Sequence, residues 1–336
     1  MREILIKEVT MIKVAINGTG RIGLCVARII GARDDIEIVA INSTADIATL
    51  AHLLRFDSVH RHSVEIEVLS EDRLRIGNSK NIRILSDREP KNLDFGEAVC
   101  VIECTGKFNS AEKSSAHLQN NVKKVVISAP AENAPMFVYG VNHESYKGES
   151  VISNASCTTN CLAPVVAVLH SNFGVESGLM TTIHSYTNDQ NVLDVKHKDI
   201  RRARAAALNM IPTSTGAAKA IGKILPELDG KLNGVAIRVP TPNVSLVDLS
   251  VRLKKSASVE AINEAFLEAE RKNPQIIHND TQKLVSSDFV DSTYSSIFVP
   301  DKTIVVDNFN AKVLAWYDNE VGYSARLVDL VAFVNA

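Results

Sequence analysis

The stretch between residues 12 and 42 constrains the fold more than any other part of the sequence. A short apolar run, "IKVAI", is followed by "NGTGRIG", by a helix-like run and by a second apolar run, "IEIVAIN". A strand, a glycine-rich turn, a helix and a second strand are typical of a dinucleotide-binding βαβ unit. Gly18 and Gly20 would let the backbone approach a pyrophosphate beside free helix amides, and Gly23 would allow close helix–strand packing. The alternative is a plain tight turn.

The alternation of strands and helices continues beyond this unit and then changes character. The runs "VCVIECTG" and "KKVVISAPA" are strand candidates, with a polar helix candidate at 110–121 between them. This pattern predicts a parallel doubly wound sheet through about residue 155. Further on, "SLVDLSVRL" alternates apolar and polar positions, which predicts an antiparallel sheet with one polar face. We therefore expect an α/β protein: a doubly wound parallel-sheet dinucleotide-binding domain plus an α+β catalytic domain with an antiparallel sheet.

The length of 336 residues fits two domains better than one. We expect a dinucleotide-binding domain at 11–156 and a catalytic domain at 157–319. The amphipathic run "YSARLVDLVAFV" predicts a C-terminal helix, at about 320–336, that packs back on the first domain. Residues 1–10 precede the first clear strand and are interpreted as a short N-terminal extension.

Composition narrows the class of partner. The net charge is −2, which gives no electrostatic bias toward nucleic acid or a membrane surface. No apolar run approaches the about 20 residues that cross a bilayer, and the N-terminus lacks a secretory cleavage pattern. We expect a cytoplasmic protein with neither a nucleic-acid nor a membrane partner.

The five cysteines are odd in number and scattered, so a disulfide framework is not expected in a reducing compartment. Cys157 and Cys161 have no second pair of Cys or His at zinc-finger spacing, and we predict no metal site. The run "SNASCTTNC" places Cys157 at the start of a predicted helix, where free amides and the helix dipole favour a thiolate. Cys161 lies one turn inside and is interpreted as packing, as are Cys25, Cys100 and Cys104.

A nucleophilic thiol needs a base, and "TTIHSYTNDQ" offers His184. Taken alone, His184 is better interpreted as a half-buried structural histidine. Candidate anion sites follow: "PTSTGAAKA" opens a helix with hydroxyls and free amides, "DIRRARAAA" carries three arginines, and Arg238 lies between two apolar residues of a predicted strand. An ordinary N-cap and a solvated basic face are the alternatives for the first two. The polar segment 188–206 is long enough to suggest a functional loop.

Five long motifs resemble one known family. "INGTGRIG", "SNASCTTNC", "TTIHSYTNDQ", "IPTSTGAAKAIGKILPELDGKLNGVAIRVPTPNVS" and "WYDNEVGYS" are similar to those of phosphorylating glyceraldehyde-3-phosphate dehydrogenases, in order, from Met11 to the C-terminus. The resemblance implies oxidation of D-glyceraldehyde 3-phosphate to 1,3-bisphosphoglycerate, in glycolysis or gluconeogenesis. It makes Cys157 the nucleophile and His184 its base. It also implies a homotetramer, because the segment 188–206 corresponds to a loop that lines the cofactor site across a subunit interface.

The resemblance also assigns the binding residues. The attacking inorganic phosphate would be held by Ser156, Thr158, Thr215 and Gly216, and the phosphate of the aldehyde by Thr187, Arg202 and Arg238. The cofactor, NAD and/or NADP, would be held by Gly18, Gly20, Arg21, Ile22, Gly23, Arg88, Ser128 and Asn319. Asn319 would orient the nicotinamide carboxamide.

Two positions depart from the NAD-specific pattern of that family. Ser43 follows Asn42 in "INSTAD", at the place where an acid normally binds the adenosine ribose, about 20 residues after the last glycine. Lys196 lies in the loop where many NAD-specific members have Leu-Pro, and it would reach the 2′-phosphate of NADP from a neighbouring subunit. We therefore predict substantial use of NADP. The alternative is that Lys196 is a solvated charge and that Asp46 binds the ribose instead.

Three other functions fit part of the pattern. Erythrose-4-phosphate dehydrogenase shares the scaffold but lacks the Thr-Gly phosphate pocket that "TSTG" retains. A Cys/His thiol hydrolase or acyltransferase would use Cys157 and His184 but leave "GTGRIG" without a purpose. A non-catalytic nucleotide-binding regulator would not need the nucleophile, base and phosphate pockets.

Overall fold

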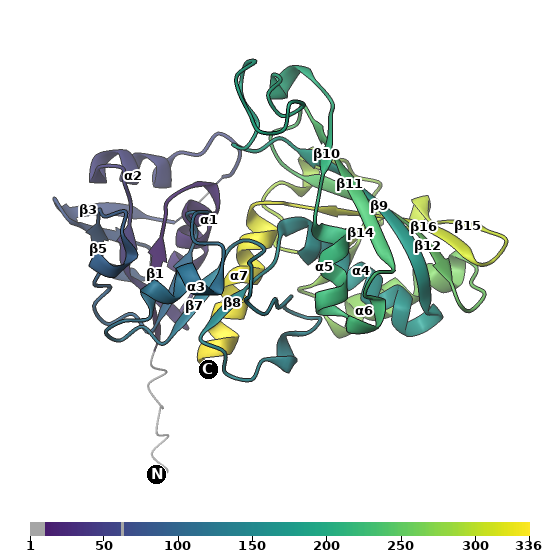
Figure 1. The fold of residues 1–336 in the computed structure, drawn as a ribbon, viewed down its shortest axis with the longest axis horizontal. Coiled ribbons are helices and arrows are strands. Elements are labelled where there is room, and N and C mark those ends of the chain that lie inside the picture. The colour runs from purple at the N-terminus through teal and green to yellow at the C-terminus, as the bar shows by residue number, and fades with distance from the viewer. Residues whose placement is uncertain (1–10, 62–63) are drawn as a thin grey trace, which may run out of the picture.

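The computed structural model describes residues 11–61 and 64–336. The extension expected at 1–10 lies outside the described residues. The fold consists of two sheets with helices around them, joined by the C-terminal helix α7 (Val321–Asn335), which runs between them (Figure 1). The predicted fold class, an α/β dinucleotide-binding domain plus an α+β domain, is confirmed.

The first sheet is parallel over six of its strands, as predicted. In spatial order its strands are β3 (Ile66–Ser70), β4 (Arg73–Ile76), β5 (Ser79–Leu85), β2 (Ile36–Asn42), β1 (Ile12–Asn17), β6 (Cys100–Glu103), β7 (Lys124–Ile127) and β8 (Val151–Ser153). The pairs from β5 to β8 are parallel, whereas β3, β4 and β5 form an antiparallel edge. The strand order reverses at β1, so a ligand site is expected at its carboxyl end.

Helices α1 (Arg21–Gly31), α2 (Ile47–Arg55) and α3 (Ala111–Ser114) accompany this sheet. The polar helix predicted at 110–121 is shorter than expected: after α3 the chain continues only as a 3₁₀ turn, Ser115–His117. α7 packs against α1 and contributes Tyr323, Leu327 and Leu330 to the core that also contains Leu24 and Ile30. The C-terminal helix thereby packs against the first helix of the dinucleotide-binding domain.

The second sheet is mixed and mostly antiparallel. In spatial order it contains β10 (Ile211–Ser214), β11 (Leu232–Val239), β9 (Val175–Ser185), β12 (Ser245–Leu253), β16 (Asn310–Tyr317), β14 (Ser296–Phe298) and β13 (Ile277–Asn279), with β15 (Ile304–Val306) paired to β16. β11 runs parallel to β9, and β13 parallel to β14. The alternation predicted for β12 is present: Val247, Leu249 and Val251 are buried on one face.

Helices α4 (Cys157–Phe173), α5 (Ala217–Ile224) and α6 (Val259–Lys272) pack against the buried face of this sheet (Figure 1). α4 begins at Cys157 because Ser156 caps it: the Ser156 hydroxyl accepts a hydrogen bond of 3.1 Å from the amide of Thr159. Within the described residues, no helix is both long and apolar enough to cross a membrane.

Candidate active site

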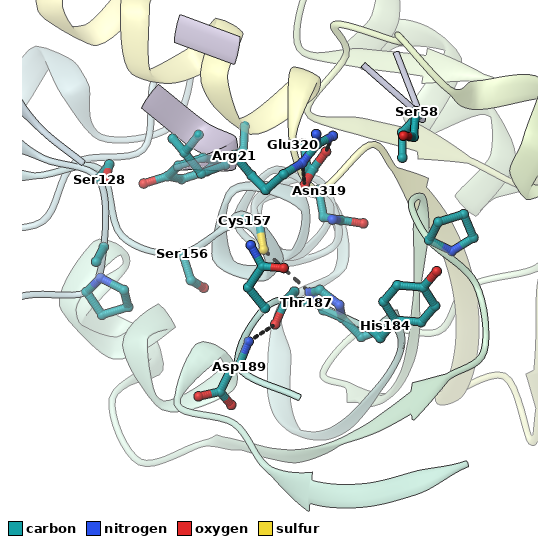
Figure 2. A pocket seen from close by; sticks show the side chains of 18 residues that line it. Arg21, Ser58, Ser128, Ser156, Cys157, His184, Thr187, Asp189, Asn319 and Glu320 are labelled. Carbon is teal, nitrogen blue, oxygen red and sulfur yellow. Dashed lines mark hydrogen bonds and ion pairs between the residues drawn. The ribbon is translucent and has the colours of Figure 1, made fainter. Parts of the chain in front are cut away.

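Cys157 and His184 meet where α4 begins and β9 ends. The sulfur of Cys157 lies 3.5 Å from Nε2 of His184 (Figure 2). The helix start and the strand end thus place a thiol and an imidazole within reach of proton transfer. His184 is 3% exposed, so the imidazole is held in the protein and not in solvent.

Two opposing effects act on the thiol. Burial raises the pKa of Cys157 above its ordinary value of 9.0, whereas Arg238 and hydrogen bonds at the start of α4, from the backbone of Cys157 and from Thr158, lower it. The lowering expected from the helix start is present, but in this structure burial is the larger effect. The net direction is therefore opposite to the one that the sequence position suggested.

Cys161 has a different environment. Its side chain is fully buried in the core of the second sheet, and its sulfur lies 3.9 Å from the backbone oxygen of Ala315. Burial raises the pKa of this thiol well above its usual range. Such an environment suits packing and disfavours a thiolate.

Strand register places a guanidinium beside the imidazole. Arg238 on β11 pairs with His184 on the parallel strand β9. Nη1 of Arg238 lies 2.9 Å from Nδ1 of His184 and 3.1 Å from the backbone oxygen of Ser185. Burial and the positive charge of Arg238 lower the pKa of His184 to about 3. The imidazole is therefore neutral around neutral pH.

A cavity of about 610 Å³ opens beside this pair toward the start of α5. It is lined by six of the seven residues expected to bind phosphate, namely Ser156, Thr158, Arg202, Thr215, Gly216 and Arg238. The seventh, Thr187, lines the adjoining cavity that contains Cys157. Ser156 and His184 line both cavities, so the two spaces meet at the reactive pair.

Arg202 is held in place by the loop that carries it. Its Nε donates to Oγ1 of Thr213 at 2.8 Å, its Nη2 donates to the backbone oxygen of Ser214 at 3.1 Å, and it forms an ion pair with Asp189. These contacts direct a positive charge along the wall of the cavity. Asp189 was not predicted as a partner from the sequence, because the pairing depends on how the 188–206 loop folds back on β10.

The adjoining cavity, of about 650 Å³, lies between the starts of α1, α4 and α7. Four residues expected to bind the cofactor line it: Arg21, Ile22, Ser128 and Asn319. Figure 2 shows Arg21, Ser128 and Asn319 around Cys157. Oδ1 of Asn319 accepts hydrogen bonds of 2.8 Å from the hydroxyls of Ser185 and Ser245. Among the described residues no hydrogen bond is given for its amide nitrogen, and this group suits contact with a carboxamide oxygen.

A third cavity, of about 270 Å³, lies beside the glycine-rich turn at the carboxyl end of β1, and Gly18, Gly20 and Arg88 line it. Gly18 has φ +101°, a conformation that favours glycine. Gly23 does not line these cavities. A Cβ there would lie 2.0 Å from the backbone oxygen of Gly18, so Gly23 permits the close packing that was predicted.

Ser43 and Lys196 are not brought together within one chain. Ser43 is 2% exposed, and its hydroxyl lies 2.7 Å from Oγ1 of Thr19 and 3.1 Å from the amide of Ala45, from which it accepts a hydrogen bond. Thr19 in turn lines the cavity beside the glycines. Lys196 is exposed on the 188–206 loop and lines none of the three cavities.

A buried charge network that the sequence did not predict supports Arg21. Nε of Arg21 donates to Glu320 at 2.9 Å and Nη1 donates to Asp57 at 2.7 Å. His60 lies between Glu320 and Asp291, with contacts of 2.8 Å and 2.7 Å. Because Asp291 belongs to the segment after β13, this network ties the second sheet's domain to the cofactor cavity.

The same network contains three potential metal ligands: the ligand atoms of Cys25, His60 and Glu320 lie within 4.8 Å of one another. Glu320 already pairs with the guanidinium of Arg21, and both ring nitrogens of His60 contact carboxylates. These contacts describe an ion-pair network and give no support for a metal centre.

Tyr317 is a further residue that the sequence did not single out. Its hydroxyl lies 2.8 Å from Oγ1 of Thr158 and 2.9 Å from Oγ1 of Thr182, and its ring packs edge-on against His184. The hydroxyl contacts hold the ring of Tyr317 in place against the imidazole of His184. Its place in "WYDNEVGYS" was the only available signal, and that motif alone does not indicate contacts more than a hundred residues away.

Comparison with known proteins agrees with this geometry. Residues 12–111 match the model of the glyceraldehyde 3-phosphate dehydrogenase NAD binding domain, and residues 156–319 match that of the glyceraldehyde 3-phosphate dehydrogenase C-terminal domain. The chain belongs to the glyceraldehyde-3-phosphate dehydrogenase family. The resemblance seen in the sequence is thereby confirmed.

Individual relatives of this family cover nearly the whole chain. Glyceraldehyde-3-phosphate dehydrogenase of Geobacillus stearothermophilus is 51% identical over 329 residues, covering 96% of this chain and 98% of the relative. The Mycobacterium avium enzyme is 52% identical over 335 residues, covering 96% and 98%. Glyceraldehyde-3-phosphate dehydrogenase 2 of Bacillus subtilis is 49% identical over 332 residues, covering 97% of each chain.

Proposed function

We propose that this chain catalyses the phosphorylating oxidation of D-glyceraldehyde 3-phosphate to 1,3-bisphosphoglycerate. One observation carries the proposal: the Cys157–His184 pair lies where a cavity lined by dinucleotide-binding residues meets a cavity lined by anion-binding residues. A thiol hydrolase or acyltransferase would need the pair but not the dinucleotide cavity. A nucleotide-binding regulator would need the cavity but not the pair.

The reaction is divided between the nucleophile and the base. The sulfur of Cys157 forms a bond to the aldehyde carbon, and the carbonyl oxygen becomes the hydroxyl of a thiohemiacetal. His184 then removes the hydroxyl proton through Nε2, the nitrogen that faces the sulfur, as a thioester forms. When bound, the nicotinamide cofactor supplies the hydride acceptor for this oxidation. Inorganic phosphate attacks the thioester, and the thiolate of Cys157 leaves.

Two sets of side chains would hold the two phosphate groups. Thr215 and Gly216 lie at the start of α5, where free amides favour an anion, and Ser156 and Thr158 at the start of α4 line the same cavity. Arg202 and Arg238 supply the positive charges of the same cavity and would hold the phosphate of the aldehyde together with Thr187. The assignment of each residue to one phosphate rests on the family resemblance.

The residues present fit a nicotinamide dinucleotide. Gly18 and Gly20 leave the backbone accessible beside the start of α1, which suits a pyrophosphate. The cavity that contains Cys157 is also lined by Arg21, Ile22 and Ser128, and there Asn319 would bind the carboxamide. Arg88 and Asn42 line the third cavity, beside the glycine-rich turn, which is the side expected for the adenosine.

The division into domains at 11–156 with 320–336, and 157–319, is part of the proposal. The two separate sheets support it, as does the packing of α7 against α1.

We propose a homotetramer as well. Leu179, Ile304 and Val306 are more than half exposed and line one shallow hollow on the open face of the second sheet, and such exposed apolar surface is typical of subunit contacts. A cytoplasmic location and a role in glycolysis or gluconeogenesis follow from the proposed reaction.

The decisive experiment measures NADH and NADPH formation from D-glyceraldehyde 3-phosphate, with and without inorganic phosphate. The expected result is oxidation whose steady-state rate depends on phosphate, because phosphate must release the thioester. Equal rates without phosphate would contradict the phosphorylating reaction. A higher kcat/KM for erythrose 4-phosphate than for D-glyceraldehyde 3-phosphate would indicate an erythrose-4-phosphate dehydrogenase. If neither cofactor is reduced, the result would favour a thiol acyltransferase.

A further inference from the structure

Nδ1 of His184 has two competing partners. It lies 2.7 Å from the backbone oxygen of Ser185 and 2.9 Å from Nη1 of Arg238. A carbonyl oxygen only accepts hydrogen bonds and a guanidinium only donates them. Nδ1 therefore bonds to Ser185 when it carries a proton and to Arg238 when it does not. The two contacts belong to different tautomers of a neutral imidazole.

The choice of tautomer decides whether His184 is able to act as a base. If Nδ1 accepts from Arg238, the proton lies on Nε2, and Nε2 then has no lone pair directed at Cys157. If Nδ1 donates to Ser185, the lone pair of Nε2 faces the sulfur, 3.5 Å away. The oxygen of Ser185 is bonded in both cases, because Nη1 of Arg238 also lies 3.1 Å from it. The two arrangements therefore exchange one hydrogen bond for another.

We propose that the phosphate of the substrate selects the base-competent tautomer by drawing Arg238 away from Nδ1 of His184. This inference rests on the proposed function, in which Arg238 binds that phosphate. Arg238 lines the anion cavity, and its Nε is buried without a hydrogen-bond partner among the described residues. An anion in the cavity offers this guanidinium acceptors that its present position lacks. The proton moves from Nε2 to Nδ1 by exchange with solvent, and no oxidant or co-reactant is needed.

The charges around His184 act in the same direction. Cys157 faces it from α4, Arg238 from β11, Arg202 from the 188–206 loop and the ring of Tyr317 from β16. Burial, Arg238 and Arg202 lower the pKa of His184, while Asp189 already pairs with Arg202. A phosphate dianion on Arg238 offsets the closest positive charge and raises this pKa. The bound substrate thus strengthens its own base.

The experiment separates the aldehyde from the phosphate. Wild-type enzyme with NAD is mixed with D-glyceraldehyde, which has no phosphate, at increasing phosphite dianion, and the first-turnover burst of NADH is recorded. We expect phosphite to accelerate this burst by about tenfold or more, as for a base that becomes competent. In Arg238→Met, the burst without phosphite should exceed that of the wild type and should not respond to phosphite. Lys223→Met removes another cation of the same cavity that has no contact with His184, and should keep the response.

A second measurement reads the tautomer directly. In enzyme labelled with ¹⁵N-histidine, the signal of His184 is assigned by its loss in His184→Asn. Saturation with glycerol 3-phosphate, which has no aldehyde, should move the Nε2 signal from the protonated to the unprotonated range. An unchanged Nε2 signal would overturn the proposal, as would phosphite that competes with glyceraldehyde 3-phosphate but does not accelerate the burst. Failure of the proposed function is a separate result, because the wild type would then not oxidise glyceraldehyde 3-phosphate at all.

Discussion

The sulfur of Cys157 lies 3.5 Å from Nε2 of His184, although 27 positions separate them in the sequence. The contact joins the first residue of a helix to the tenth residue of an eleven-residue strand. It forms because β9 begins just after α4 ends and runs back to the start of that helix. This one contact distinguishes a reactive thiol from the four other cysteines.

Replacing Cys157 with serine should abolish phosphate-dependent aldehyde oxidation. A serine hydroxyl has no thiolate character at neutral pH, so the acyl intermediate does not form at a useful rate. The burst of NADH in the first turnover is the measurement. Cys161→Ser is the matched control, because its sulfur is buried in the core and should leave most of the activity intact. The reverse ranking of the two variants would contradict the assignment of the nucleophile.

Replacing His184 with asparagine should slow the burst by about 10²- to 10⁴-fold, the usual range for loss of a general base. NAD affinity, measured by fluorescence titration, should stay near the wild-type value, because Asn319 and Arg21 remain in place. Comparable losses of cofactor affinity and burst rate would indicate a structural role for His184.

A neutral imidazole is also expected across the working pH range, because burial and Arg238 lower the pKa of His184 to about 3.

The sequence predicted those parts of this site that local patterns encode. The strand–glycine–helix order located the dinucleotide cavity, and the hydroxyl-rich starts of α4 and α5 located the nucleophile and a phosphate pocket. Partnerships formed across the fold left no local pattern. Arg238 beside His184 depends on the parallel register of β11 on β9, and the contact of His60 with Asp291 joins segments 231 positions apart. The mixed character of the second sheet was missed for the same reason, since alternation in one strand does not give its neighbour's direction.

The buried network around Arg21 should contribute to stability in a pH-dependent way. Asp57 pairs with Arg21 and lies 3.3 Å from Arg28. Burial raises the pKa of Asp57, but the guanidinium of Arg21 and the backbone amides of Val59 and His60 hold it well below 3.8. Because the folded-state pKa is lowered, the stabilisation is fully present above the unfolded-state pKa of about 3.9 and is lost as pH falls through the folded-state value. Asp57→Asn should lower the free energy of unfolding by about 3 kcal/mol at pH 7, since it leaves buried Arg28 unpaired.

Urea denaturation at several pH values tests this expectation. The difference between wild type and Asp57→Asn should be constant from pH 7 to pH 5 and should shrink below about pH 4, as the wild-type carboxylate takes up a proton. Glu71→Gln, at an exposed acid, is the control and should change stability little at any pH. A difference of the same size at pH 3 and pH 7 would show that the effect of Asp57 is one of packing and not of charge.

The last prediction concerns cofactor preference, and the structure bears on both interpretations of "INSTAD". Ser43 presents a hydroxyl at the end of β2, in contact with Thr19 at the edge of the adenosine-side cavity. The rival group, Asp46, caps α2: its two oxygens accept from the amide and hydroxyl of Thr49 at 2.9 Å and 2.7 Å. Asp46 is therefore occupied within its own helix. Asp87 is the carboxylate that lines this cavity, and its two oxygens accept from the amide of Glu89 at 2.8 Å and from Nδ2 of Asn92 at 3.2 Å.

We expect the wild type to use NADP with a kcat/KM within about tenfold of that for NAD. A carboxylate at position 43 would repel the 2′-phosphate, and loss of Lys196 would remove a positive charge proposed to reach it from a neighbouring subunit. Ser43→Asp with Lys196→Pro should shift the NADP/NAD ratio of kcat/KM toward NAD by at least about tenfold, equivalent to about 1.4 kcal/mol. Residue 43 is buried, so a substitution there could also destabilise the fold. Ser43→Ala, which adds no charge, is the control, and the melting temperature of each variant is compared with that of the wild type to separate a loss of folding from a change in cofactor preference. Strict NAD specificity in the wild type would contradict this expectation, and so would an unchanged ratio in the double variant.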